Sequence, residues 1–370
     1  MKAYILNFII CMLLSFISDV MFKKNKKKIG IIFVILIVLV MSTIAGVRSE
    51  TVGTDIHNYV TSLFKYSYQL HVGIFDIYSK FGVELGFTLL VFISSKFGDL
   101  NLVLFFIQIA VVLPIVLYSY KMKEKVPISI NIFIFLMTMY SYSFSMMRQS
   151  VAISIGLLSV YYFKNDDRKR GFLSIFIAYL FHRTSIILIV FYYLIKYVYY
   201  ENKNSYFYLF IIMFLFFTLS ILLPNLISLL PVKYSNYLDS RFVSSVNFYS
   251  MIKKIIWIIP VTICLLKTRI SNLEMKNDLF FSMLLIVLDI LTYLIGIRVP
   301  TVSRLALYFT NISCFIYFPY ILKMFKPKIF SQVFFIFLII FLWWHMTTND
   351  SSANIYPYRS DIFTSLNDVY

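Results

Sequence analysis

Two polar residues stand side by side inside a long apolar run. His182 and Arg183 lie in "AYLFHRTSIILI" (residues 178–189). Hydrocarbon tolerates such groups only where they pair, reach the interface or line a wet cavity. Histidine changes its charge nearest to neutral pH and therefore suits proton transfer. The pair marks either a tight polar turn between two short helices or a functional site.

Carboxylates occur in two further polar stretches. Asp55 and Tyr59 lie in "RSETVGTDIHNY" (48–59), where Gly53 permits a turn. Glu84 directly precedes a short apolar piece at 85–97. A solvated loop is the alternative interpretation for Asp55. An ordinary acid that faces a helix dipole is the alternative for Glu84.

Arginines of two segments suit the binding of phosphate, because their rigid fork of donors matches phosphate oxygens. Arg148 and Gln149 lie between two apolar spans in "SMMRQS". Arg298 and Arg304 flank a proline in "IRVPTVSRLALYF" (297–309), and Tyr308 follows one turn later. Arginines that only anchor helix ends at the interface are the alternative.

Aromatic residues surround a proline near the C-terminus. Tyr356 and Tyr358 lie in "IYPYRSDIF" (355–363). They could stack on sugar rings or belong to an interfacial aromatic belt.

The composition predicts the fold class. The chain is 60% hydrophobic and 14% charged, with a mean hydropathy of +0.83. Many apolar runs have about 20 residues, the length that spans ~30 Å of hydrocarbon. We therefore expect an all-α polytopic membrane protein with residues 1–370 in a single membrane domain. None of the three cysteines has metal-ligand spacing, and we expect no metal site.

Lysine clusters predict the orientation in the membrane. Under the positive-inside rule, all of them can be cytoplasmic only with about 12 transmembrane helices and both termini outside. Segment 85–97 is then re-entrant or interfacial; if it crosses, the orientation of everything downstream reverses. The expected outer parts are loops 48–84 and 224–252 and tail 346–370. The expected spans are 4–22, 29–47, 101–120, 127–144, 149–163, 171–182, 184–199, 206–223, 253–266, 279–297, 305–322 and 329–345.

The two kinds of basic residue separate in this topology. Most lysines fall inside, whereas seven of the ten arginines and all four histidines fall outside or at outer helix ends. The net charge of +17 therefore indicates membrane orientation and not nucleic-acid binding. The arginines on the outer side do not follow this rule, and we expect them to have a role other than orientation in the membrane.

Six motifs, in this order, resemble the EpsG family, which groups with Wzy-type polymerases of O-antigen and capsule. They are "VGTDIHNY", "VELGF", "MMRQSVAISI", "IAYLFHRTSIIL", "RLALYF" and the closing "YPY". The chain departs from the family pattern at Arg183, where the family tends to have a small polar residue.

The resemblance implies glycosyl transfer on the outer side of a bacterial cytoplasmic membrane, without cofactor. The growing glycan would leave polyprenyl pyrophosphate for a sugar hydroxyl of another lipid-linked repeat. His182 would act as base, or Asp55 or Glu84 in its place or orienting it. A carboxylate could also stabilise an oxocarbenium-like state. The remaining expected contacts are Arg148, Arg298 and Arg304 with pyrophosphate, and Tyr59, Gln149, Tyr308, Tyr356 and Tyr358 with sugar or lipid.

Partners implied by the resemblance are the lipid-linked oligosaccharide, membrane lipid, a flippase and a chain-length regulator. Three alternatives remain open. A flippase of the same lipid-linked oligosaccharide would also need arginines, but should show an internal repeat. An O-antigen ligase or related lipid-sugar transferase should have a larger outer loop. A scaffold subunit would need none of these polar residues.

Overall fold

The computed structural model describes residues 1–69, 71–200, 210–211, 214, 218, 258–267, 273–296, 300–324, 329–349 and 353–364. Within these ranges the regular elements are all helical, as the composition predicted. The described chain divides into two compact units, one made mainly of the N-terminal half and the other mainly of the C-terminal half.

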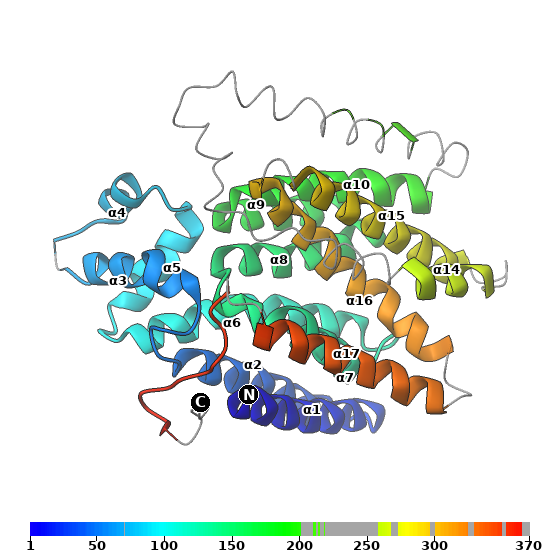
Figure 1. Ribbon diagram of the computed structural model, residues 1–370, viewed down its shortest axis with the longest axis horizontal. Coiled ribbons are helices and arrows are strands. Elements are labelled where there is room, and N and C mark those ends of the chain that lie inside the picture. The colour runs from blue at the N-terminus through cyan, green and yellow to red at the C-terminus, as the bar shows by residue number, and fades with distance from the viewer. Residues whose placement is uncertain are drawn as a thin grey trace. The chain divides into compact units, whose positions relative to one another are not determined.

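The first unit comprises Met1–Tyr161, Arg168–Ile186 and Val333–Tyr370. In it α1 (Lys2–Lys23) packs against α2 (Lys27–Gly46), and α2 packs against α6 (Leu100–Met122) (Figure 1). The other elements that begin in this unit are η1 (Ile56–Val60), α3 (Thr61–Ser67), α4 (Ile74–Phe81), α5 (Leu85–Ser95), α7 (Ile128–Phe135), η2 (Leu136–Tyr140), η3 (Tyr142–Phe144), α8 (Met147–Lys164), α9 (Arg168–Phe181) and η4 (Arg183–Ile187).

Acidic side chains begin two of these helices. The carboxylate of Asp99 accepts a hydrogen bond from the Asn101 N–H at the start of α6, at 2.8 Å. Asp19, near the end of α1, accepts from the Ile128 and Ser129 N–H groups, at 2.8 and 3.1 Å. Both satisfy N–H groups that a helix leaves unpaired at its start. Asp19 thereby also fastens α7 to α1.

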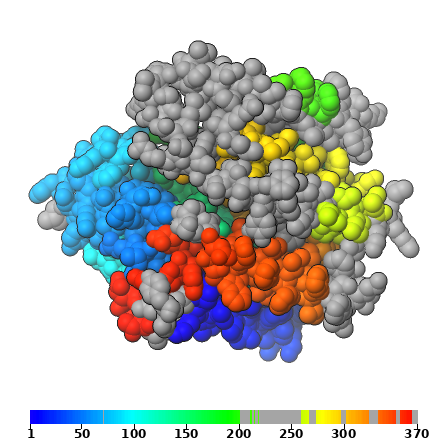
Figure 2. Space-filling model, viewed as in Figure 1, coloured from blue at the N-terminus to red at the C-terminus, as the bar shows by residue number. Residues whose placement is uncertain are grey.

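The C-terminal segment is part of the first unit. Residues 353–364, in red, lie against α1, in blue (Figure 2). The hydroxyl of Tyr4 donates to the Ile355 carbonyl at 2.7 Å, and Ser360 Oγ donates to the Val47 carbonyl at 2.6 Å. These bonds tie the segment to the ends of α1 and α2.

The second unit comprises Tyr162–Asp167 and Ile187–Gln332. Its buried Asp278 accepts from Lys164 Nζ at 2.5 Å, from the Tyr320 hydroxyl at 2.5 Å and from the Tyr199 hydroxyl. These donors fasten three neighbouring segments to one helix. The described elements are α10 (Leu188–Ile195), η5 (Lys196–Tyr200), α14 (Ile258–Lys267), α15 (Leu273–Gly296), η8 (Pro300–Leu305) and α16 (Ala306–Met324); α17 (Ile329–Asn349) begins here and ends in the first unit.

Six described helices are long and apolar enough to cross a membrane. They are Lys2–Lys23, Lys27–Gly46, Leu100–Met122, Leu273–Gly296, Val302–Lys323 and Gln332–Asn349, and each coincides with an expected span. Helices also occupy five further expected spans, but they are short, interrupted by π or 3₁₀ turns, or polar at one end. Span 206–223 lies mostly outside the described residues. The count of about 12 therefore stays a prediction.

The apolar piece at 85–97 forms α5, a helix of 11 residues. At 1.5 Å per residue it rises roughly 16 Å, about half of the hydrocarbon thickness. It packs against α3, α4, α6 and α9 of its own unit. A helix of this length agrees with a short segment that does not cross.

Candidate functional site

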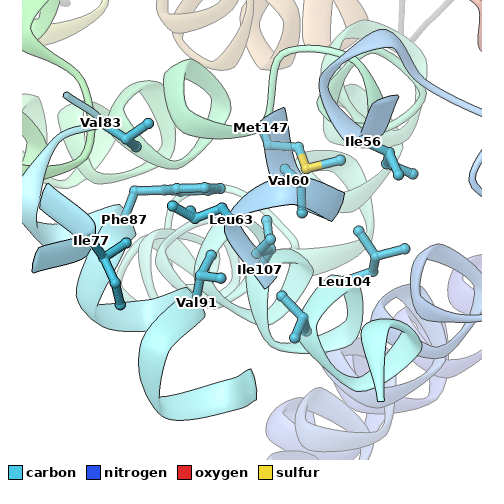
Figure 3. Close-up of a cluster of buried hydrophobic side chains, with 11 residues drawn as sticks. Ile56, Val60, Leu63, Ile77, Val83, Phe87, Val91, Leu104, Ile107 and Met147 are labelled. Carbon is cyan, nitrogen blue, oxygen red and sulfur yellow. The ribbon is translucent and has the colours of Figure 1, made fainter. Parts of the chain in front are cut away.

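A buried apolar cluster in the first unit brings distant polar residues together. Its members include Ile56, Val60, Val83, Phe87 and Met147 (Figure 3). Several of them are sequence neighbours of predicted site residues, because Ile56 follows Asp55, Val83 precedes Glu84 and Met147 precedes Arg148. Phe181, which precedes His182, packs against the same cluster. Burial of the apolar neighbours thus places the polar side chains at its edge.

Glu84 lies at the centre of these polar residues, just before α5. Its Oε2 accepts from Arg148 Nη1 at 2.6 Å, and its Oε1 lies 3.2 Å from His182 Nδ1. The Arg183 backbone N–H also donates to Oε1, at 3.3 Å. Only 9% of the Glu84 side chain is exposed. One carboxylate therefore joins segments that lie 64 and 98 residues apart in the sequence.

The surroundings keep Glu84 ionised. Burial alone raises the pKa of the carboxyl, but the hydrogen bond with His182 and the charge of Arg148 outweigh it. Together they lower the pKa of Glu84 from its ordinary 4.5 to about 2. Glu84 is thus a fixed negative charge at neutral pH and orients its two partners.

His182 occupies the break between α9 and η4, which is where we expected a turn. Its backbone N–H donates to the Ala178 carbonyl at 2.9 Å, and its carbonyl accepts from the Ser185 N–H at 3.0 Å. The side chain is 15% exposed. With Nδ1 donating to Glu84, Nε2 carries the lone pair of the ring. This arrangement is that of a base held by an orienting carboxylate.

Arg148 is held from two sides. Its guanidinium bonds Glu84 and lies over the ring of Tyr59, 4.5 Å from the centroid. The Tyr59 hydroxyl donates to Asp55 Oδ2 at 2.7 Å, and the Met147 N–H donates to the same oxygen at 2.9 Å. Asp55 therefore caps the start of α8, the helix that carries Arg148.

The loop before Asp55 packs tightly on the segment before α8. Gly53 has φ +96°, and a Cβ there would lie 2.2 Å from the Phe144 carbonyl oxygen, so only glycine fits. The hydroxyls of Thr54 and Ser145 lie 2.7 Å apart. The turn expected at Gly53 thus serves a close approach of two backbone segments.

Arg48, which opens the same motif as Asp55, is buried. It is 2% exposed, donates to the Ala45 and Val52 carbonyls and lies 4.4 Å from the Phe144 ring centroid. Burial lowers the pKa of this guanidinium to about 10, so it stays protonated at neutral pH. Its hydrogen bonds join the end of α2 to the loop that leads to Asp55.

Of the two C-terminal tyrosines, Tyr358 does not suit the expected contact with sugar. Tyr358 is fully buried, and its hydroxyl donates to the Ile44 carbonyl at 2.7 Å. A ring without an accessible face cannot stack on a sugar, so we interpret Tyr358 as packing of the tail against α2. Tyr356, in contrast, is 36% exposed.

The other predicted residues fall in three parts of the chain. Gln149 is buried in the first turn of α8. Arg304, which is exposed, and Tyr308, which is buried, belong to η8 and α16 of the second unit. Arg298 lies outside the described residues. The structure therefore brings together Asp55, Tyr59, Glu84, Arg148 and His182.

The cluster offers an oriented base, a fixed carboxylate and a cation. In the parts of the chain that the structure describes, no group of three or more His, Cys, Asp or Glu side chains could hold a metal ion. The chemistry that these residues support is proton transfer beside a positive charge.

In the part of the chain that the structure describes, the elements are helical and six helices are long and apolar enough to cross a membrane, which indicates a polytopic membrane protein. The model of the EpsG family matches residues 31–360. The chain therefore belongs to the EpsG family, a family similar to the Wzy-type polymerases. No curated protein and no solved structure matches the chain.

Proposed function

We propose that this protein polymerises lipid-linked repeat units of a surface polysaccharide, which is a capsule, an O-antigen or an exopolysaccharide. The reaction takes place on the outer side of the bacterial cytoplasmic membrane. It transfers the growing glycan from polyprenyl pyrophosphate to a sugar hydroxyl of a second lipid-linked repeat. Membership of the EpsG family supports the class of reaction.

The contact between His182 and Glu84 carries the proposal. In the proposed step, the acceptor hydroxyl oxygen attacks the anomeric carbon of the donor glycan. The bond from that carbon to the pyrophosphate oxygen breaks, and the polyprenyl pyrophosphate leaves with the electron pair. The hydroxyl proton passes to Nε2 of His182, and Glu84 stabilises the resulting imidazolium across 3.2 Å.

The role that we propose for Arg148 is to orient Glu84, and not first to bind pyrophosphate. Because Glu84 pairs with its guanidinium, Arg148 first fixes the orientation of Glu84 and places a positive charge near the reacting atoms. Arg298 and Arg304 stay sequence-based proposals for contacts with pyrophosphate. Tyr59 and Tyr356 are the proposed aromatic contacts for sugar or lipid.

Glycan analysis of a deletion strain tests this function. We expect single lipid-linked repeats to accumulate on the outer leaflet, because export continues while polymerisation stops. Repeats trapped on the cytoplasmic leaflet would instead identify a flippase. Full-length polymer that fails to reach its final acceptor would identify a ligase.

A further inference from the structure

The proposed reaction requires a cation for the pyrophosphate leaving group, whose negative charge grows as the glycosidic bond breaks. Arg148 is already neutralised by Glu84 at 2.6 Å. The buried Arg48 stays protonated and interacts electrostatically with Asp55, so the charges of Asp55, Glu84, Arg148 and Arg48 sum to zero when His182 is neutral. The cluster therefore has no net positive charge that would attract pyrophosphate.

Arg183 lies beside this cluster and meets that requirement. Its backbone N–H donates to Glu84 Oε1 at 3.3 Å, and the same oxygen contacts His182. Its side chain is exposed, unlike those of Glu84 and Arg48. Among the described residues, no ion pair or hydrogen bond holds its guanidinium. The backbone is thus fixed at the site, while the charged end is available to a ligand.

Arg183 also changes the charge of the site. With its guanidinium, the five charged side chains carry one net positive charge, which attracts an anion. An arginine fork can also bond two phosphate oxygens at once. Pyrophosphate is the anion that every substrate of the proposed reaction carries, whereas an acidic sugar is not needed for the chemistry.

We propose that Arg183 binds the pyrophosphate of the lipid-linked substrate beside the His182–Glu84 pair. The proposal rests on the proposed polymerase function and names the residue that holds its leaving group. Arg183 is then a binding residue for the substrate, and Arg148 a positioning residue for Glu84.

Kinetics of purified protein in liposomes test this assignment with three variants. Arg183→Gln removes the charge, Arg183→Lys keeps it, and Lys65→Gln removes an exposed charge from α3 of the same unit. The measurements are the KM for a polyprenyl-pyrophosphate-linked repeat and the inhibition by inorganic pyrophosphate. Inhibition by glucuronate, run in parallel, reports whether the arginine recognises a sugar carboxylate instead.

We expect Arg183→Gln to raise the KM and to weaken inhibition by pyrophosphate, each about tenfold, or about 1.4 kcal/mol. Arg183→Lys should recover part of both, because it keeps the charge but not the fork of donors, and Lys65→Gln should match the wild type. Unchanged inhibition by pyrophosphate in Arg183→Gln would overturn the assignment, as would weakened inhibition by glucuronate alone.

Failure of the polymerase function is separable from failure of this assignment. If the wild type makes no polymer, the proposed function fails before any variant is measured. Protection of the purified protein against thermal unfolding by inorganic pyrophosphate then decides the role of Arg183. Protection that is lost in Arg183→Gln supports the assignment, and equal protection of both proteins refutes it.

Discussion

Replacing Glu84 by glutamine removes the charge that joins Arg148 and His182 and keeps the size of the side chain. The fall in pKa from 4.5 to about 2 corresponds to about 3 kcal/mol of stabilisation at neutral pH. Because glutamine still offers one hydrogen-bond acceptor, the expected loss of stability is up to about 3 kcal/mol. The loss of the orienting carboxylate should also lower kcat by about 10²–10⁴.

The difference in stability between wild type and Glu84→Gln should depend on pH. A carboxyl with a depressed pKa in the folded state stabilises the protein above its ordinary pKa, and the effect is lost as the pH falls toward the folded value. The difference in stability between wild type and Glu84→Gln should therefore be full at pH 7. It should shrink to less than half at about pH 3.

Thermal unfolding in detergent and turnover in liposomes measure the two effects of Glu84→Gln. Glu50→Gln is the matched control, because Glu50 is exposed in the preceding loop and accepts one bond, from Thr61 at 3.3 Å. It should change the stability by less than about 0.5 kcal/mol. A Glu84→Gln protein with the stability and kcat of the wild type would refute the reasoning.

Three further changes probe other parts of the account. His182→Ala should abolish polymer in cells while protein levels and single lipid-linked repeats remain, and polymer of normal length would remove His182 from the site. Tyr358→Phe should cost about 1–3 kcal/mol in thermal unfolding because it leaves the Ile44 carbonyl without its donor. Its KM should stay unchanged; a raised KM with unchanged stability would restore the role in sugar binding. Single cysteines at positions 57 and 165 should react with an impermeant reagent only at 57, and the opposite pattern would reverse the orientation.

The long apolar helices and the break at His182 were the part of this fold that the sequence could predict. The long runs that contain α1, α2, α6 and α15 were identified by length alone, because each needs only its own composition to form a helix in a membrane. The break at His182 was also predictable, since the run around it is too long for one span. The π turns Leu136–Tyr140 and Lys196–Tyr200 had no sequence signature.

The partners of the site residues were not predictable. Glu84, Arg148 and His182 were each selected for their type, but their pairing depends on how the cluster around Met147 folds. Arg148 was therefore expected to face phosphate, whereas it faces a carboxylate. Tyr358 was expected to contact sugar. The sequence does not reveal that the tail packs on α2, where the hydroxyl of Tyr358 finds its partner.

Reconstitution tests the central claim most directly. Purified protein in liposomes would receive a polyprenyl-pyrophosphate-linked repeat as its sole substrate, and the glycans would be separated on a gel. We expect a ladder of longer glycans with release of polyprenyl pyrophosphate from the wild type, and single repeats alone from His182→Ala. Wild-type protein that moves the single repeat across the bilayer without lengthening it would contradict the claim.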